Sequence, residues 1–219
     1  MTPILHQIPA SRSFRTLWLL HEMGITPELR TYSITDGSLR TPEYLGLSPA
    51  GRIPALEIDG LTIYESGAIS EYLCATRPEH GLGRAVGDAD YVPFLEAMHY
   101  AETAGSLIEN LNLQWLFLRD PAQRSDTVAK LHARRLASTL KPLETRLSGQ
   151  DHILASGFSA ADTMMSFSIA AARRYVRFDA FPNLSAYSDR MAERPAYKAA
   201  RAQEGPSAFG GEDFYEVTG

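Results

Sequence analysis

The spacing of apolar residues changes near Pro78, and this change limits the possible folds more than any other feature of the sequence. Residues 4–76 switch repeatedly between strand-like and helix-like spacing, whereas residues 87–203 have helical spacing almost throughout. The stretch that joins them, RPEHGLGR, contains a proline and two glycines, which interrupt regular structure. The sequence therefore predicts two domains, residues 1–78 and residues 87–219, joined by a short linker.

The first domain is predicted to alternate strands and helices. Phe14, Leu17 and Trp18 mark the buried side of the first helix, and Asp59-Gly60 is a strong two-residue hairpin signal. The order is strand, helix, strand, helix, strand, strand, helix, which is an α/β arrangement. We expect these elements at residues 4–7, 14–24, 29–33, 42–47, 55–58, 61–64 and 69–76.

The second domain is predicted to be helical. A helix of unusual length, at about residues 88–118, has one apolar side, and the next helix contains Pro142, which should kink it. Ser159 followed by Asp162 has the spacing of a capping box and opens a third helix. Two shorter helices follow, and the aromatic residues of the tail could cover a pocket or pack elsewhere. The two helices are expected to begin at Pro182 and Pro195, and the tail comprises residues 205–219.

The composition excludes several classes of protein. Of the 219 residues 44% are hydrophobic, and no run approaches the roughly 20 apolar residues that a membrane-spanning helix needs. The formal net charge of −5 argues against nucleic-acid binding, and the six histidines lack metal-ligand spacing. Cys74 is the single cysteine, so no internal disulfide can form, and we expect it to be a small core residue. Because the first residues also lack a secretory signal, we expect a soluble cytoplasmic protein with no metal, membrane or nucleic-acid partner.

Several stretches, taken in order, resemble the cytosolic glutathione transferase family. SRSFRTLWLLHEMG is similar to that family's first helix, and SPAGRIPALEIDGLTIYESGAISEYL to its glutathione-binding hairpin and helix. FSAAD and FPNLSAYSDRMAERPAY resemble its helical domain, and MHYAETAGSL resembles a bacterial or fungal subgroup. The resemblance covers nearly the whole chain. It implies an α/β thioredoxin-like N-terminal domain that binds glutathione, plus an all-α helical C-terminal domain that supplies an electrophile pocket.

The same resemblance assigns residues to glutathione binding. The Ile53–Pro54 bond is expected to be cis, with Ile53 offering its N–H and C=O to the cysteinyl part of glutathione, as a sheet edge pairs with a peptide. Glu65 and Ser66 stand where a helix begins, and its unpaired N–H groups suit a carboxylate. We expect Ser66 to bind the γ-glutamyl carboxylate and Glu65 the neighbouring ammonium. The structural alternatives are an ordinary trans proline and a simple helix cap.

Three further assignments depend on the resemblance. Arg40 and Arg52 match positions where a basic side chain approaches the glycyl carboxylate, although either could be a solvated arginine. Ser11 matches the hydroxyl that serine-type members place at the sulfur, Ser13 is its rival, and either could be only the helix cap. Serine in place of tyrosine or cysteine indicates a bacterial serine-type member. The electrophile is expected between Ile8, Pro9 and Tyr100, although aromatic residues such as Tyr100 often belong to a core.

The leading hypothesis is a detoxifying transferase that lowers the pKa of the glutathione thiol and conjugates the thiolate to an apolar electrophile. A thiol with a pKa near 8.5 is mostly protonated at neutral pH, so an activating donor is required. The resemblance also implies a homodimer, with glutathione as the co-substrate. Two alternatives stay open. The same thiolate could cleave ethers or halides reductively or reduce peroxides, or the chain could be a non-catalytic glutathione-fold binding module.

Overall fold

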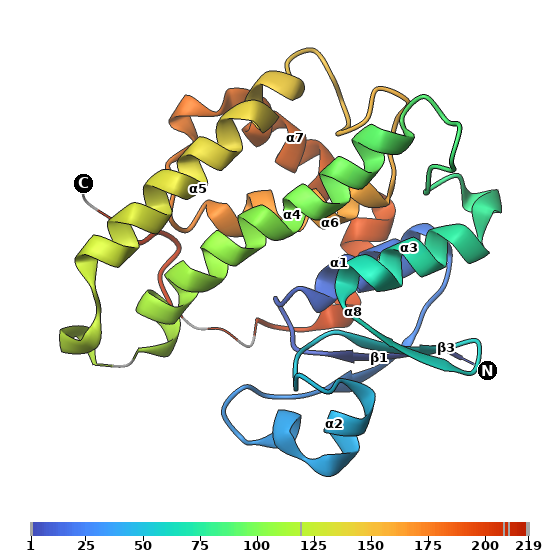
Figure 1. Cartoon of the computed structure of the whole chain (residues 1–219), viewed down its shortest axis with the longest axis horizontal. Helices are drawn as coiled ribbons and strands as arrows, with labels where there is room; N and C mark the ends of the chain where they lie inside the picture. The colour runs from blue at the N-terminus through green and yellow to red at the C-terminus, as the bar shows by residue number, and fades with distance from the viewer. Residues whose placement is uncertain (1, 119, 208, 210, 218–219) are drawn as a thin grey trace. The chain divides into compact units, whose positions relative to one another are not determined.

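The computed structural model describes residues 2–118, 120–207, 209 and 211–217 (Figure 1). The chain forms two compact units. The first is Met1–Val86 with Glu193–Phe209, and the second is Gly87–Ala192 with Gly210–Gly219. The first unit therefore contains a segment from late in the sequence.

The first unit is built on a four-stranded sheet with the strand order β2-β1-β3-β4. Its central strand β1 (Ile4–Gln7) pairs parallel with β2 (Glu28–Thr31) and antiparallel with β3 (Ala55–Ile58), which pairs antiparallel with β4 (Leu61–Tyr64). The hairpin predicted at Asp59-Gly60 is present, and both of its residues have positive φ.

Helices cover both faces of this sheet. Figure 1 shows α1, α3 and α8 on one face and α2 beyond the other. Phe14, Leu17 and Trp18 are buried on α1, as predicted. The helical elements of this unit are α1 (Ser13–Glu22), η1 (Ser38–Arg40), α2 (Pro42–Leu47), α3 (Ser66–Thr76), η2 (Pro78–His80) and α8 (Pro195–Glu204).

Helix α8 packs on α1, which explains why it belongs to the first unit. The Tyr197 ring meets the rings of Phe14 and Trp18 edge-on, with centroids 5.1 Å and 5.0 Å away. Arg194, directly before α8, forms a two-point ion pair with Glu22 of α1 at 2.7 Å and 2.8 Å. The predicted second domain, residues 87–219, therefore differs from the second compact unit by this returning segment.

The second unit is helical. The predicted long helix is α4 (Tyr91–Asn112), continued by the π-helical turn η3 (Leu113–Phe117). Pro142 lies inside α5, and the helix continues to Arg146. The remaining elements are η4 (Pro121–Gln123), α5 (Asp126–Arg146), α6 (Ala160–Ala172), η5 (Phe178–Ala180) and α7 (Pro182–Glu193).

The capping box predicted at the start of α6 is confirmed. Ser159 Oγ accepts the Ala161 N–H at 3.3 Å, and Asp162 Oδ2 accepts the Ser159 N–H at 2.9 Å. Asp162 is fully buried, and its other carboxylate oxygen accepts the Ile153 N–H and the Tyr187 hydroxyl, each at 2.9 Å. This one carboxylate therefore joins the preceding loop, the helix start and α7.

One tail aromatic packs inside the second unit. The Tyr215 ring is nearly parallel to those of Trp115 and Tyr175, with centroids 5.1 Å and 5.7 Å away. Its N–H donates to the Arg174 carbonyl at 2.8 Å. The tail is thus anchored on the end of α6 and on η3. Among the described residues, no helix is long and apolar enough to cross a membrane.

Candidate functional site

Three segments that contain predicted site residues leave the sheet at the same end. The register pairs His6 of β1 with Ala55 of β3, and Ala55 with Tyr64 of β4. The segment after β1, the segment before β3 and the segment after β4 therefore lie together at one end of the sheet. These segments are residues 8–11, Ile53-Pro54 and Glu65-Ser66.

The backbone of Ile53 is open to a partner. The Ile53–Pro54 bond is cis, as predicted. Among the described residues, no hydrogen bond to the Ile53 N–H or C=O is found. By contrast, the preceding carbonyl, that of Arg52, accepts the Tyr44 hydroxyl at 2.7 Å and the Ser48 hydroxyl at 2.8 Å. These hydroxyls hold the Arg52 carbonyl, whereas the Ile53 N–H and C=O are hydrogen-bonded to no group in the described part of the chain.

The start of α3 combines an unusual backbone with a buried hydroxyl. Glu65 has φ 72°, a conformation that residues with a Cβ rarely adopt, and its side chain is exposed. Ser66 is 4% exposed, and its Oγ accepts a hydrogen bond from Arg15 Nη1 at 3.2 Å. Arg15 is itself fully buried on α1. The first N–H groups of α3 and a guanidinium therefore give this place a positive potential that suits a carboxylate.

The two candidate serines at the start of α1 differ in their surroundings. The Ser13 hydroxyl is fully buried and donates to the Ile8 carbonyl at 3.1 Å. Because its single proton is used there, Ser13 Oγ accepts from the Ser11 hydroxyl, 2.8 Å away. Ser11 Oγ in turn accepts the Ser13 N–H at 3.2 Å, and Ser11 is partly exposed. The hydroxyl that can turn toward a ligand at the helix start is therefore that of Ser11.

Both predicted arginines lie near Ile53. The Arg40 guanidinium donates to the Ala50 carbonyl at 3.2 Å. It also packs closely on Gly51, where an added Cβ would lie 2.7 Å from Arg40 Nη1. Gly51 also has φ +61°, so this position strongly favours glycine. Arg40 and Arg52 are both exposed, so their side chains are accessible to an anion.

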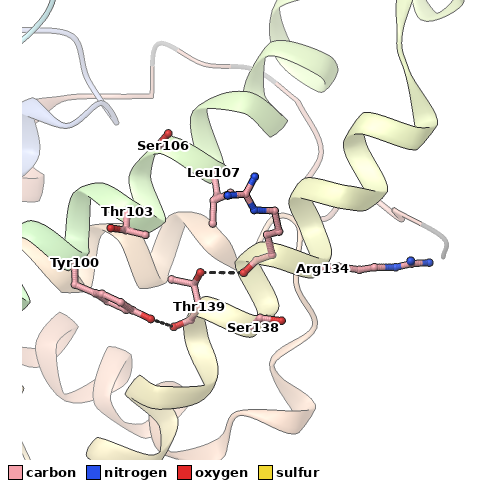
Figure 2. Close-up of a pocket in the computed structure, with 8 residues that line it drawn as sticks. Tyr100, Thr103, Ser106, Leu107, Arg134, Ser138 and Thr139 are labelled. Atoms are coloured by element: carbon pink, nitrogen blue, oxygen red, sulfur yellow. Dashed lines mark hydrogen bonds between the residues drawn. The ribbon is translucent and has the colours of Figure 1, made fainter.

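The residues predicted to bind the electrophile lie in different units. Ile8 and Pro9 are buried in the first unit. Tyr100 lies in the second, where its hydroxyl donates to the Thr139 carbonyl at 3.0 Å and burial raises the pKa of Tyr100. Figure 2 shows Tyr100 at a pocket of about 550 Å³ between α4 and α5. The grouping of these three residues around an electrophile stays a prediction.

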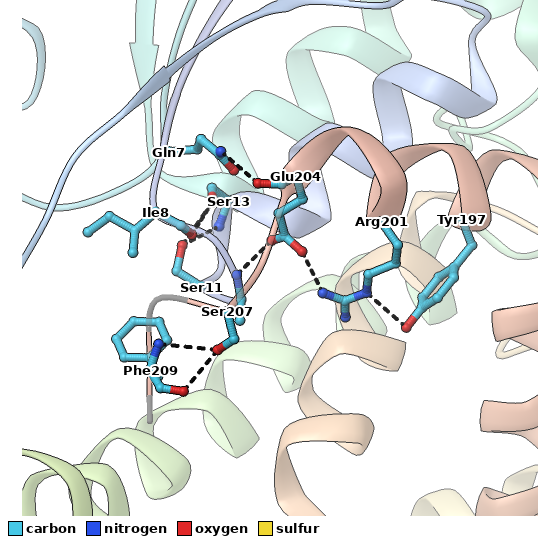
Figure 3. Close-up of polar contacts among 10 residues, drawn as sticks. Gln7, Ile8, Ser11, Ser13, Tyr197, Arg201, Glu204, Ser207 and Phe209 are labelled. Atoms are coloured by element: carbon cyan, nitrogen blue, oxygen red, sulfur yellow. Dashed lines mark hydrogen bonds and ion pairs between the residues drawn. The ribbon is translucent and has the colours of Figure 1, made fainter. Parts of the chain in front are cut away.

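Sequence reasoning missed two residues that contact the predicted site. Arg15 lies within the first helix beside the apolar stripe, and its only signal in the sequence is a charge in a helix with a predicted buried side. Glu204, at the end of α8, accepts the Ala10 N–H at 2.8 Å (Figure 3). Nothing in the local sequence relates Glu204 to Ala10, because 194 positions separate them.

The single cysteine takes no part in this site. Burial raises the pKa of Cys74 to about 12, so the group is a thiol rather than a thiolate at neutral pH. Its Cβ lies 2.7 Å from the position that a Cβ on Gly83 would occupy, which shows how closely the loop packs on α3. Within the part of the chain that the structure describes, no group of three or more His, Cys, Asp or Glu residues could hold a metal ion.

Two family models match the chain. The model for the glutathione S-transferase N-terminal domain matches residues 11–76, and the model for the glutathione S-transferase C-terminal domain matches residues 110–195. Glutathione S-transferase 4 of Zea mays is 30% identical over 190 residues, which cover 83% of each chain. Glutathione S-transferase 3 of Schizosaccharomyces pombe is 27% identical over 214 residues, covering 90% of this chain and 86% of the relative.

Solved structures match over almost the same length. A sphingomonad glutathione S-transferase complexed with glutathione is 28% identical, with a TM-score of 0.76 over 92% of this chain and 98% of that one. The transferase URE2P6 of Phanerochaete chrysosporium is 22% identical, with a TM-score of 0.83 over 93% and 98% of the two chains. Together with the observed sheet and helices, these matches confirm the predicted fold class, an α/β thioredoxin-like N-terminal domain plus an all-α C-terminal domain.

Proposed function

Because the chain belongs to the glutathione S-transferase family of enzymes, we propose that it binds glutathione, lowers the pKa of its thiol and conjugates the thiolate to an apolar electrophile. The observation that carries this proposal is the end of the sheet at which Ile53, with its open backbone donor and acceptor, meets the start of α3. A short peptide with a carboxylate at one end fits this combination.

The proposed binding mode uses each predicted residue for one part of glutathione. The Ile53 N–H and C=O pair with the cysteinyl residue, and the Ser66 hydroxyl and N–H bind the γ-glutamyl carboxylate. The exposed Glu65 carboxylate receives the neighbouring ammonium. Arg40 or Arg52 pairs with the glycyl carboxylate, because both guanidinium groups are exposed near Ile53.

Thiol activation is assigned to Ser11. The Ser11 hydroxyl rotates from Ser13 Oγ to the sulfur, while Ser13 keeps its own bond to the Ile8 carbonyl. Lowering a thiol pKa by 2 requires about 2.7 kcal/mol of preference for the thiolate. A hydrogen bond to a charged group contributes about 1.5–3 kcal/mol, and a helix N-terminus adds about 0.3–1 kcal/mol. The two sources together supply about 1.8–4 kcal/mol, a range that includes the required value.

The chemical step requires no further group on the protein. The thiol proton passes to water, and a sulfur electron pair forms the bond to the electrophilic carbon. The leaving group departs with the electrons of its former bond to that carbon. The Ser11 hydroxyl holds the thiolate in place until this attack.

The proposal includes a homodimer in the cytoplasm and a serine-type subgroup. The single cysteine suits a reducing compartment, and Ser11 supports the serine-type assignment. Light scattering of the purified chain should give twice its mass of 24.2 kDa. A mass equal to that of one chain would contradict the dimer and leave the glutathione site untouched.

Calorimetry and product analysis test the function. Glutathione should bind with measurable heat, and an activated chloronitrobenzene should yield the glutathione conjugate. Oxidised glutathione with a dehalogenated or reduced product would point instead to reductive chemistry. Binding without any product across a panel of electrophiles would favour the non-catalytic module, and no binding heat would remove the proposal.

A further inference from the structure

The loop between β1 and α1 is held at two points by one residue of α8. Glu204 Oε1 accepts the Ala10 N–H at 2.8 Å, and the Glu204 carbonyl accepts Gln7 Nε2 at 3.3 Å (Figure 3). Between these bonds lie Ile8 and Pro9, and directly after them comes Ser11. The contact therefore acts on the segment that carries the hydroxyl assigned to thiol activation.

This loop has a conformation that needs support. The Ser11 N–H donates to the Ile8 carbonyl at 3.1 Å and closes a tight turn with Pro9 and Ala10 at its centre. Ala10 has φ 62°, a left-handed conformation that is unfavourable for a residue with a Cβ. The bond from the Ala10 N–H to a carboxylate is about twice as strong as one between neutral groups, so it opposes rearrangement of the turn.

The carboxylate is itself rigidly placed. Glu204 is 4% exposed, and Arg201 Nη1 donates to its second oxygen at 2.6 Å. The Arg201 guanidinium stacks on the Phe14 ring of α1, 3.6 Å from the ring centre, and Arg201 Nε donates to the Tyr197 hydroxyl at 3.2 Å. One carboxylate oxygen therefore faces a fixed arginine, and the other faces Ala10.

We propose that Glu204 is a positioning residue for thiol activation: its carboxylate fixes the Ala10 N–H and thereby holds the Ser11 hydroxyl where the glutathione sulfur binds. This inference rests on the proposed function. It makes α8, through a contact that spans 194 positions, a part of the glutathione site.

Three substitutions of Glu204 distinguish the effect of its hydrogen-bond acceptor from the effect of its size. Glu204→Leu removes the acceptor, Glu204→Asp withdraws it by one methylene, and Glu204→Gln keeps an oxygen that can accept the Ala10 N–H. In the full chain, the Leu and Asp variants should raise the pKa of the bound glutathione thiol by about 1, because one pKa unit is close to the worth of one well-placed hydrogen bond. The ultraviolet absorbance of the thiolate against pH measures this value. The Gln variant keeps a neutral acceptor and should raise this pKa by less than the Leu and Asp variants.

Glu22 supplies a matched control, because it also joins α8 to α1. Its carboxylate accepts Arg194 at 2.7 Å and 2.8 Å and Trp18 Nε1 at 2.8 Å, at the opposite end of α1 from Ser11. Glu22→Leu should lower the melting temperature and leave the pKa of the bound thiol unchanged. An equal rise of that pKa in Glu22→Leu and Glu204→Leu would overturn the proposal, because general loosening of α8 would then explain both.

Hydrogen exchange at the Ala10 amide separates this inference from the proposed function, since it needs no ligand. The amide should exchange faster in Glu204→Leu and Glu204→Asp than in wild type and Glu22→Leu. If the wild type forms no bound thiolate, the proposed function fails, and the exchange rates alone still report whether Glu204 holds the loop. Unchanged exchange at Ala10 with an unchanged thiol pKa would overturn the inference. If Glu204→Leu does not fold, Glu204→Asp gives the decision.

Discussion

The two serines at the start of α1 show how hydrogen-bond direction decides a role at the scale of one residue. Both hydroxyls lie at a helix N-terminus and within 2.8 Å of one another. Ser13 has used its proton on the Ile8 carbonyl and is fully buried, whereas the proton of Ser11 points only at Ser13 Oγ. A single torsional change therefore frees Ser11 as a donor, while Ser13 would have to break a buried bond.

Replacing each serine by alanine in a separate variant should affect different properties: the thiol pKa for Ser11 and the stability for Ser13. Ser11→Ala should raise the pKa of the bound glutathione thiol by about 1–2, because the thiolate loses its hydrogen-bond donor. It should also lower kcat/KM at neutral pH by about tenfold or more. Ser13→Ala should change that pKa little and cost about 1 kcal/mol of unfolding free energy. Thiolate absorbance against pH and urea unfolding measure the two effects. Identical thiolate titrations of wild type and Ser11→Ala would rule out Ser11 as the activating residue.

At the scale of an element, the buried carboxylate of Asp162 holds the start of α6 in place. Asp162 accepts hydrogen bonds from the Ile153 and Ser159 amides and from the Tyr187 hydroxyl. Burial raises the pKa of Asp162 although these donors and His152 lower it. These donors compensate the buried carboxyl group for the water that it loses on folding.

Removing that carboxylate should cost more than removing the serine of the same capping box. Asp162→Ala leaves three buried donors without their acceptor and should destabilise the chain by roughly 3 kcal/mol or more. Ser159→Ala loses only the cap to the helix amides and should cost about 1 kcal/mol. Urea unfolding of the two variants gives both values. Equal losses would mean that Asp162 acts only as a helix cap and not as the link to α7.

At the scale of the whole molecule, the chain leaves the first compact unit after residue 86 and returns to it at residue 193. The returning segment includes Arg194 and helix α8, and it brings Arg194, Tyr197, Arg201 and Glu204 against the first helix and the loop before it. Stability and the geometry of the proposed glutathione site are therefore expected to be coupled through the same short helix.

This coupling should be visible in the pH dependence of stability. Burial raises the pKa of Glu204 above its ordinary value of 4.5, although Arg201 and the Ala10 N–H lower it. The folded chain then binds a proton at Glu204 more tightly than the unfolded chain, so stability falls as pH rises through the folded pKa. This contribution is fully present below pH 4.5. The unfolding free energy of wild type minus that of Glu204→Gln should decrease as pH rises above this value.

Chemical unfolding at a series of pH values provides the measurement, and the Gln variant removes the titrating group while it keeps the size of the side chain. A difference that stays constant from acid to neutral pH would show that the Glu204 pKa is the same in the folded and unfolded chains. A difference that grows with pH would show that Arg201 outweighs the burial of the carboxylate.

The local sequence determined several features that depend on neighbours a few positions apart. The Asp59-Gly60 hairpin, the Ser159/Asp162 capping box and the buried side of α1 follow from turn conformation, hydrogen-bond reach and helical spacing, and each is present. The sequence favours Ser11 over Ser13 by position and leaves Ser13 as a rival, because both stand within reach of the same helix start.

Only the tertiary structure decided which distant groups meet. The sheet register brings Ile53 and Glu65 to the end of β1, and the packing of α8 on α1 places Glu204 at Ala10. These contacts depend on apolar surfaces that fit together across the whole chain, so no local pattern encodes them. The residues of the proposed site could thus be named from the sequence, whereas their support by Arg15 and Glu204 arises from folding.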